Sequence, residues 1–350
     1  MTADHKIRVL IVDDSAIVRK MLAEALAAEP DLEVVGTAPD PFVARDKILS
    51  LRPDVLTLDV EMPRMDGLTF LKKLMRFHPL PVIVISSLAQ SSSQTALEAL
   101  QCGAVEVLAK PGGPYSVGEL KHDLPHKVRA AAHARVGNAR PQLAAPVAAA
   151  PLVLAGASSS TVIAIGASTG GTEALREVLT GLPGNMPGIV IVQHIPPVFS
   201  SAFAKRLNDL CRLRVKEAAD GDRVTAGLAL IAPGNFHMTL GQAGGEYRVS
   251  VRDGPRVCYQ RPSVDVLFES VAQAARGDAI GAILTGMGSD GAQGMLKMKR
   301  TGARTIAQDE ASCVVFGMPR EAIRTGAVDR VLPLHKIAAE LTSMSALVAR

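Results

Sequence analysis

The 350-residue chain contains no tryptophan, and aromatic residues make up only 3% of it. Its cores must therefore be built from aliphatic side chains, which suits parallel sheets whose strands are buried on both faces. Cysteine is also scarce, and no CxxC pair occurs among the four: Cys102, Cys211, Cys258 and Cys313. Scattered cysteines of this kind are typical of reduced thiols, so we expect a cytoplasmic protein.

Long hydrophobic runs are absent as well. No stretch of 18 or more apolar residues occurs, so we expect no insertion into a membrane. The opening segment MTADHKIRVLIVDDS lacks the apolar region and cleavage site of a secretory signal. The formal net charge is only +4, which argues weakly for a nucleic-acid partner, and we expect none.

The first part of the chain alternates apolar runs with amphipathic segments, a pattern that indicates a parallel sheet covered by helices. We expect a flavodoxin-like domain with a five-stranded parallel sheet over residues 1–115. Its ligand site should lie at the carboxyl ends of the strands, where the strand order reverses. The expected strands are Ile7–Val12, Leu32–Thr37, Val55–Leu58, Val82–Ile85 and Val105–Leu108.

Residues 116–160 are expected to form a linker, because much of this segment is rich in alanine, proline and serine. A helix within residues 117–134 is compatible with this pattern. A second alternation follows over residues 161–350 and predicts a doubly wound, mostly parallel α/β domain of the hydrolase type. A hairpin insertion is expected around residues 214–257. The expected strands are Val162–Ile165, Gly188–Val192, Leu228–Ile231, Tyr247–Val251, Ala279–Leu284 and Ala303–Ala307.

Charged and hydroxyl side chains follow the expected strands of the first domain. Asp13 and Asp14 come after the first strand, Asp59 ends the third, and Ser86 and Lys110 follow the fourth and fifth. Because parallel strands end at one edge, these groups should share a crevice. Three carboxylates favour a hard cation such as Mg²⁺, and one of them, Asp59, can accept a phosphoryl group. Ser86 and Lys110 can then hold the phosphoryl oxygens.

The segments VLIVDDS, LTLDVEMPRMDGL, PVIVISS and LAKP resemble the receiver domain of bacterial response regulators. The resemblance covers about residues 6–112. It implies that Asp59 is the phosphoacceptor, that Asp13 and Asp14 help to bind the metal, and that Ser86 and Lys110 form the phosphoryl switch. It also implies a histidine kinase as the phosphodonor.

A serine lies in a glycine-rich turn at the start of the second domain. The segment IAIGASTGG reads as a strand, a tight turn and a helix start, which would present the hydroxyl of Ser168 beside unpaired backbone N–H groups. A phosphate-binding glycine loop is the rival interpretation. It is disfavoured because Ser168 replaces the third glycine and the next strand ends in Gln193-His194 rather than in an acidic residue.

The other members of a catalytic triad are expected at neighbouring strand ends. His194 is the candidate general base, and Asp290 in the segment TGMGSDG is the candidate acid that orients it. The backbone of Met287 can add an oxyanion donor. His237 competes as the base, although its context is less typical of a strand end. Asp290 by itself is also compatible with a cap of the helix that follows it.

The segments GASTGG, QH, APGNFHM, DVLFES and LTGMGSDGAQG resemble the catalytic domain of the CheB family of chemotaxis methylesterases, over about residues 161–345. The resemblance implies Ser168, His194 and Asp290 as the triad, with Thr169 and Met287 in support. It implies a protein-glutamate methylesterase and protein-glutamine glutaminase that acts on methyl-accepting chemoreceptors. It further implies phosphorylation by a chemotaxis histidine kinase and no metal at this second site.

Two other functions remain open at this point. A DNA-binding response regulator would require a helix-turn-helix with a basic recognition face, which the strand-rich second half does not predict. A phosphorylation-controlled scaffold with an inactive triad is the other alternative. Only an activity measurement separates that scaffold from an enzyme.

Overall fold

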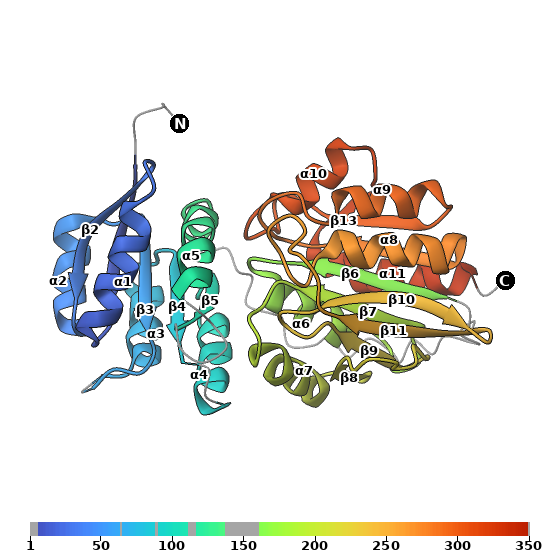
Figure 1. Cartoon of the computed structure of the whole chain (residues 1–350), viewed down its shortest axis with the longest axis horizontal. Helices are drawn as coiled ribbons and strands as arrows, with labels where there is room; N and C mark the ends of the chain where they lie inside the picture. Colours follow the sequence, from blue (N-terminus) through green and yellow to red (C-terminus); the bar gives the residue numbers. More distant parts are fainter. Residues whose placement is uncertain (1–5, 64, 88–89, 111–116, 137–160, 349–350) are drawn as a thin grey trace. The chain divides into compact units, whose positions relative to one another are not determined.

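The computed structural model describes residues 6–63, 65–87, 90–110, 117–136 and 161–348. The chain forms two compact units, residues 1–143 and 144–350 (Figure 1). Much of the expected linker, residues 137–160, lies outside the described residues, so the expected limits of the domains stay predictions. Among the described helices, none is long and apolar enough to cross a membrane.

The first unit is built on a five-stranded parallel sheet with the strand order β2-β1-β3-β4-β5, which confirms the expected flavodoxin-like fold (Figure 1). The strands are β1 Ile7–Val12, β2 Leu32–Ala38, β3 Val55–Asp59, β4 Val82–Ser86 and β5 Glu106–Ala109. The helices are α1 Ala16–Ala27, α2 Pro41–Leu51, α3 Gly67–Phe77, α4 Gln90–Gln101 and α5 Val117–Ala132.

Local sequence explains these elements. Strands β3 and β4 are buried at every position, as expected of aliphatic strands covered by helices on both faces. Helix α1 starts where Ser15 caps it, and Asp40 and Asp66 cap α2 and α3 in the same way. Strands β1 and β3 are neighbours although β2 lies between them in the chain, so the strand order reverses beside β1. This is where ligands bind in such sheets.

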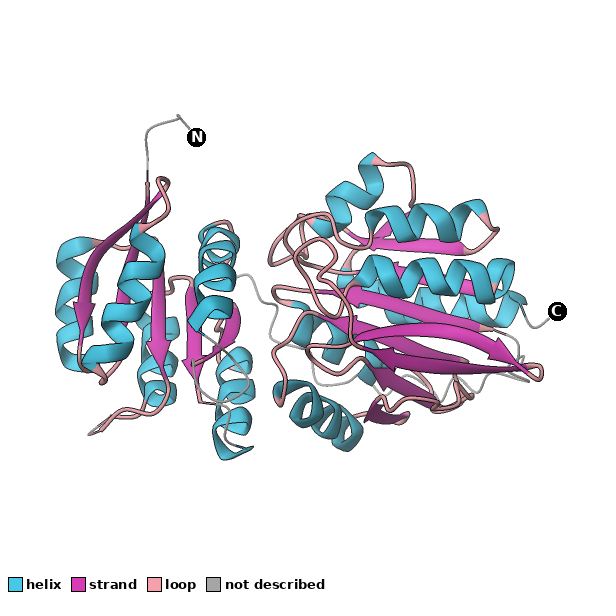
Figure 2. Cartoon of the chain, viewed as in Figure 1, coloured by secondary structure: helices cyan, strands magenta, loops and turns pink. Residues whose placement is uncertain are grey.

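The second unit contains a seven-stranded sheet with the order β14-β13-β12-β6-β7-β9-β8, and every pair in it is parallel (Figure 2). Its strands are β6 Val162–Ala167, β7 Gly188–Gln193, β8 Arg214–Glu217, β9 Leu228–Ile231, β12 Ala279–Ile283, β13 Arg304–Gln308 and β14 Arg330–Leu332. The helices are α6 Gly171–Gly181, α7 Phe199–Leu210, α8 Val264–Ala274, α9 Ala292–Arg300, α10 Met318–Arg324 and α11 Leu334–Val348, with a short 3₁₀ turn at Arg276–Asp278.

The expected hairpin insertion is present but smaller than its predicted range. Strands β10 His237–Ala243 and β11 Glu246–Arg252 form an antiparallel pair outside the main sheet. Strand β8 lies within the range predicted for the insertion, yet it pairs in parallel with β9 at the edge of the main sheet. Only part of the predicted range is therefore hairpin.

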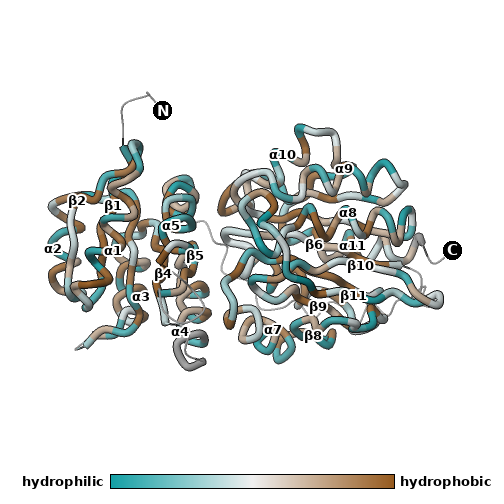
Figure 3. The backbone as a smooth tube through the Cα atoms, in the orientation of Figure 1, coloured by the Kyte–Doolittle hydropathy of each residue, from teal (hydrophilic) through white to brown (hydrophobic). Residues whose placement is uncertain are grey.

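The central strands of the second unit carry its hydrophobic core. Strands β6, β7 and β12 are buried at every position. Figure 3 shows hydrophobic residues along the strands of this unit. Strand β6 pairs with β7 on one side and with β12 on the other, so the strand order reverses here too. The carboxyl ends of these three strands consequently lie side by side, which places the segments that follow them at one edge of the sheet.

Candidate functional site

The five side chains predicted for the first site are positioned by the ends of four strands. Asp13 follows β1 and is buried, while its neighbour Asp14 is exposed. Asp59 and Ser86 end β3 and β4 and are fully buried. Lys110 follows β5, and its Nζ lies 2.7 Å from Asp59 Oδ2 and 3.4 Å from Asp13 Oδ2. The structure therefore brings the ammonium and two of the carboxylates into contact.

Burial dominates the electrostatics of this pocket. It raises the pKa of Asp59 to about 6, although the hydrogen bonds from Lys110 and Glu61 N act in the opposite direction. Burial likewise raises the pKa of Asp13. It would lower the pKa of Lys110, but the hydrogen bond and charge of Asp59 outweigh burial and raise that pKa. The single ammonium of Lys110 therefore does not balance the negative charge of the two buried carboxylates.

The acidic residues fit a divalent metal. Asp13, Asp14 and Asp59 each offer a carboxylate oxygen, and these oxygens lie within 4.8 Å of one another. Asp13 Oδ2 is buried, and apart from its 3.4 Å ion pair with Lys110 Nζ it has no hydrogen-bond partner among the described residues. An all-oxygen donor set that includes a buried oxygen with only one long ion pair suits Mg²⁺. Ser86 Oγ lies 3.5 Å from Ser87 O, and its role as a switch stays a prediction.

Ser168 lies in the turn between β6 and α6 and is buried. Its backbone N–H donates to Thr285 O at 3.0 Å, and its carbonyl accepts from Gly171 N at 2.7 Å and Gln193 Nε2 at 2.9 Å. Gly170 has a φ of +76°, a conformation that favours glycine. The loop after β12 and the end of β7 therefore fix the backbone of the serine on two sides.

Glycines permit the close approach of these loops. A Cβ atom added at Gly286 would lie 2.7 Å from Ser168 Cβ and 2.3 Å from Met318 Sδ. A Cβ atom at Gly171 would lie 2.2 Å from Gln193 Oε1. All three distances are far shorter than van der Waals contact, so the turn around Ser168 needs glycine at both positions.

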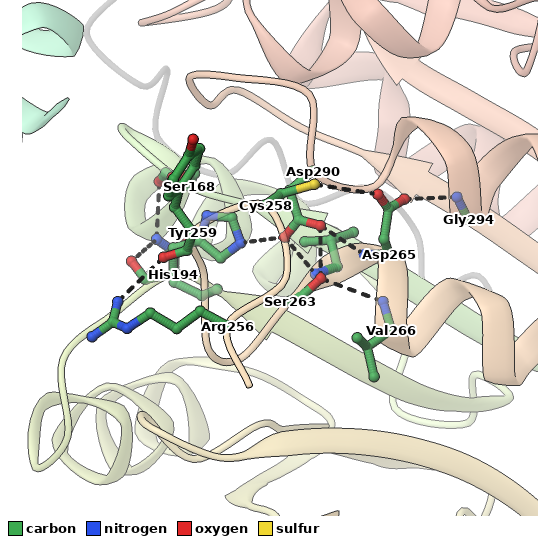
Figure 4. A network of polar contacts seen from close by, with 12 residues as sticks. Ser168, His194, Arg256, Cys258, Tyr259, Ser263, Asp265, Val266, Asp290 and Gly294 are labelled. Carbon is green, nitrogen blue, oxygen red and sulfur yellow. Dashed lines mark hydrogen bonds and ion pairs between the residues drawn. The ribbon is translucent and has the colours of Figure 1, made fainter. Parts of the chain in front are cut away.

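His194 directly follows β7 and forms a buried pair with Asp290. Its Nε2 lies 2.8 Å from Asp290 Oδ2, and both side chains are almost completely buried. A carboxylate can only accept, so Nε2 carries a proton, and Nδ1 is the nitrogen of this ring that can act as an acceptor. Nδ1 is buried without a hydrogen-bond partner among the described residues. The ring lies between Ser168 and Asp290 (Figure 4).

Asp290 is held by the first turn of α8. Its Oδ1 accepts from Ser263 Oγ at 2.7 Å and Asp265 N at 3.0 Å, and its Oδ2 accepts from Val264 N at 2.7 Å (Figure 4). Burial acts to raise the pKa of Asp290, but the hydrogen bonds from His194, from Asp265 N and from Ser263 together outweigh it and hold the pKa below its ordinary value. The carboxylate therefore stays ionised beside His194.

Asp290 was also a candidate cap for the helix that follows it, α9, and this alternative is wrong. Its carboxylate caps α8, which precedes it in the chain. The first turn of α9 is bonded instead by Asp265, whose Oδ1 accepts from Gly294 N at 2.6 Å. Sequence reasoning missed Ser263 as a partner of Asp290. Its signal was a serine directly before the apolar run that starts α8, which is typical of an N-cap.

His237, the rival candidate for the general base, contacts backbone groups through both of its ring nitrogens. His237 Nδ1 accepts from Ser263 N at 3.2 Å, and its Nε2 lies 2.8 Å from Pro255 O, so both ring nitrogens are occupied.

Burial, followed by the charges of Asp290 and Asp265, raises the pKa of Cys258 to about 11. That thiol is therefore protonated at neutral pH and is a poor nucleophile. Each of the four cysteines, all within the described residues, is a free thiol.

The two supporting residues lie on the loops around Ser168. Thr169 is buried, and its carbonyl accepts from Thr285 Oγ1 at 3.0 Å. Met287 is half-buried and is flanked by Gly286 and by Gly288, which has a φ of +86°. Thr169 directly follows Ser168, and Met287 directly follows Gly286, which packs against Ser168. Their part in binding an oxyanion stays a prediction.

Comparison with known proteins places both units in families. The CheB methylesterase family matches residues 163–341, and the response regulator receiver domain family matches residues 9–120. The DNA-binding alternative is thereby wrong for the second unit, since its matched family is an esterase. The crystal structure of the CheB methylesterase catalytic domain of Thermotoga maritima is 41% identical. It covers 53% of this chain and 100% of its own, with a TM-score of 0.52.

Full-length relatives share both units. A protein-glutamate methylesterase/protein-glutamine glutaminase of Syntrophus aciditrophicus is 58% identical over 97% of this chain and 99% of its own. The corresponding protein of Salmonella typhimurium is 54% identical over 96% of each chain. The chain therefore belongs to the CheB family of protein-glutamate methylesterases/protein-glutamine glutaminases, with a receiver domain ahead of its catalytic domain.

Proposed function

We propose that the chain hydrolyses glutamate γ-methyl esters on methyl-accepting chemoreceptors and deamidates receptor glutamines, which resets receptor signalling in chemotaxis. The family assignment supports the activity, and the names of its full-length relatives support the two substrates. Each cleaved ester leaves a carboxylate, so the reaction adds negative charge to the receptor.

The reaction starts with the buried pair. His194 accepts the Ser168 hydroxyl proton at Nδ1 while Nε2 stays bonded to Asp290. Ser168 Oγ attacks the ester carbonyl carbon and forms a tetrahedral intermediate. Backbone N–H groups near Thr169 and Met287 stabilise its oxyanion.

The intermediate then collapses. The bond to the methoxy oxygen breaks, His194 returns the proton, and methanol leaves. Water, deprotonated by the same imidazole, attacks the acyl-enzyme and releases the glutamate carboxylate and the Ser168 hydroxyl. With a glutamine substrate the same steps release ammonia in place of methanol.

One observation carries this proposal. The 2.8 Å contact of His194 with Asp290 is buried, Asp290 is held by three donors of α8, and Nδ1 of the same ring has no partner among the described residues. An oriented imidazole with one free acceptor beside a serine is what a general base requires.

The test is methanol release from a methylated cytoplasmic fragment of a chemoreceptor. Wild type and Ser168→Ala are compared, each with Mg²⁺ and a small phosphodonor. We expect release by the wild type and a loss of about 10⁴-fold or more in the variant. Equal release by both chains would remove Ser168 from the mechanism. No release by a phosphorylated wild type would favour the scaffold with an inactive triad.

The first unit is proposed to act as the phosphorylation switch of the enzyme. Asp59 accepts the phosphoryl group from a chemotaxis histidine kinase, and Lys110 and Ser86 bind its oxygens. Asp13, Asp14 and Asp59 would hold Mg²⁺, which when bound offsets the negative charge of the carboxylates and the phosphoryl oxygens.

The domain order suggests how the switch acts. Phosphate adds a charge of about −1.5 to −2 to the receiver, enough to rearrange hydrogen bonds near Ser86. We propose that the unphosphorylated receiver inhibits the catalytic domain. A chain that begins near Ala155 should then release methanol faster than the unphosphorylated full chain. Equal rates would contradict inhibition by the receiver.

The proposed partners are chemoreceptors and a kinase, with no nucleic acid. We place the enzyme in the cytoplasm, associated with the membrane only through the receptors. The pattern of scattered cysteines in the sequence supports this location.

A further inference from the structure

His237 is the first residue of β10, it is only 7% exposed, and both nitrogens of its ring contact backbone groups. Nδ1 lies 3.2 Å from Ser263 N, and Nε2 lies 2.8 Å from Pro255 O. A backbone N–H can only donate and a carbonyl can only accept. The ring is therefore neutral, with its proton on Nε2, and it links two segments of the chain.

We infer that His237 is a positioning residue with two separable effects, an inference that rests on the proposed esterase function. Its Nδ1 fixes the turn that holds Asp290 and thereby supports the chemical step. Its Nε2–H fixes the segment 253–262 beside the triad and thereby supports substrate binding.

The first effect follows from the bonds of Ser263. This residue is fully buried, and its N–H donates to His237 while its Oγ donates to Asp290 Oδ1 at 2.7 Å. The next two N–H groups, of Val264 and Asp265, also donate to Asp290. The position of this one turn thus sets the position of the carboxylate. Without an acceptor at Nδ1, a buried N–H would lose its partner and the turn would shift.

The second effect follows from the position of the segment 253–262, which contains Pro255. Gly254 packs on the imidazole, since a Cβ atom added there would lie 3.3 Å from His237 Cδ2. Cys258 Sγ, farther along, lies within 4.8 Å of a carboxylate oxygen of Asp290. Tyr259 is 65% exposed, and its carbonyl accepts from Arg256 Nη1 at 3.2 Å (Figure 4). This segment therefore lines the site beside Asp290 and offers exposed side chains to a substrate.

Arg261 provides a second anchor for the segment. Its guanidinium donates to Asn235 Oδ1 at 2.7 Å and to Gly254 O at 2.6 Å, and it forms an ion pair with Asp253. Loss of the bond to Pro255 alone should therefore loosen the segment without detaching it. The expected effect on substrate binding is moderate.

Two substitutions test the roles of the two ring nitrogens of His237 separately. In His237→Asn the amide oxygen takes the place of Nδ1, so Ser263 N–H keeps an acceptor while Pro255 O loses its donor. In His237→Gln the longer side chain places its amide nitrogen near the position of Nε2, so Pro255 O keeps a donor while Ser263 N–H loses its acceptor. Both variants remove the imidazole and so control for its packing.

We expect opposite kinetic effects on methanol release. His237→Asn should raise KM about three- to tenfold with kcat within about twofold of the wild type, because the substrate must order a looser segment. His237→Gln should lower kcat about ten- to hundredfold with KM within about twofold, because a buried N–H is left unpaired next to Asp290. Parallel changes in both variants, or wild-type constants in both, would overturn the proposal.

Two further measurements exclude other causes. Calorimetry gives the folded fraction of each variant, and each kcat is corrected by dividing it by this fraction. A loss of folded protein does not change KM. The ¹⁵N NMR shifts of a histidine-labelled wild type should place the proton of His237 on Nε2, and a proton on Nδ1 would overturn the proposal. A wild type that releases no methanol would instead overturn the proposed function and, with it, this inference. Wild-type activity without the kinetic split would overturn this inference alone.

Discussion

Ser263 Oγ donates a 2.7 Å hydrogen bond to Asp290 Oδ1, although the two residues are 27 positions apart in the chain. The serine is the N-cap of α8, and its oxygen also accepts from Val266 N at 3.4 Å. One hydroxyl thus starts a helix and orients the acid of the proposed triad. The start of α8 and the geometry of the catalytic acid are therefore coupled.

Ser263→Ala should affect both properties. The loss of the cap and of a buried hydrogen bond should destabilise the catalytic domain by about 1–2 kcal/mol. Since Asp290 loses one of its donors, kcat for methanol release should fall about tenfold or more. Steady-state kinetics and calorimetry measure the two effects on the same preparation.

Asp329→Ala is the matched control for that loss of stability. Asp329 accepts from Thr305 N at 2.9 Å at the amino end of β13, whereas the triad lies at the carboxyl ends of the strands. This control should destabilise the same domain and leave kcat unchanged once the folded fraction is taken into account. An equal loss of kcat in both variants would argue against a positioning role for Ser263.

Asp290→Asn should make the stability of the catalytic domain less dependent on pH. The folded-state pKa of Asp290 lies below its ordinary value of 3.8. The ionised carboxylate therefore contributes stability above that value, and the contribution is lost as the pH falls through the folded-state pKa. The wild type should have a higher Tm than the variant at neutral pH, and this difference should shrink below about pH 4.

Differential scanning calorimetry between neutral and acidic pH tests this, and it suits a chain without tryptophan. A difference in Tm that grows on acidification would contradict an Asp290 that is ionised in the folded domain.

Gly286→Ala should reduce activity more than stability. The added Cβ would lie 2.7 Å from Ser168 Cβ, so the loop and the nucleophile must move apart. We expect kcat to fall about 100-fold, as for a reacting group displaced by about 1 Å. Gly288→Ala is the comparison in the same loop. It has no described heavy atom within 4 Å of its added Cβ, and its φ of +86° costs only about 1–2 kcal/mol of strain. Equal losses of kcat in both variants would contradict the packing explanation.

Phosphoryl uptake should depend on Asp59 and on Mg²⁺. With a radiolabelled small phosphodonor, Asp59→Asn should incorporate no label, since an amide is not a nucleophile toward phosphorus. Removal of Mg²⁺ with a chelator should abolish uptake by the wild type, and Asp13→Asn should require more Mg²⁺ because it replaces a charged carboxylate ligand with a neutral amide. Ser168→Ala should take up label normally. Full uptake by Asp59→Asn would assign the phosphoacceptor elsewhere.

Sequence reasoning predicted most of the fold because the buried strands are aliphatic runs. β6 and β7 are buried at every position and appear as such in the sequence. By contrast, β14 has only three residues, two of them exposed, and α10 begins with Met318-Pro319 and has seven. Elements this short carry no periodic signal, and tertiary contacts with β13 and α9 fix them.

The positions of the candidate residues after strands of one sheet were predictable, but the groups that orient them were not. Ser168, His194 and Asp290 each follow a strand, and the parallel sheet brings such positions to one edge. The capping of α8 by Asp290 depends on how one helix packs against a loop distant in sequence. A local capping signal reports on its own helix only, so Ser263 and His237 required the structure.

The central claim is that Ser168, His194 and Asp290 act as one unit, and double substitution tests it most directly. Methanol release is measured for Ser168→Ala, His194→Gln and the chain that carries both. If the three residues act as one unit, the double variant should be no slower than Ser168→Ala alone, because Ser168→Ala already removes the chemistry that His194 supports. Losses that multiply in the double variant, or a Ser168→Ala chain as active as the wild type, would contradict the account.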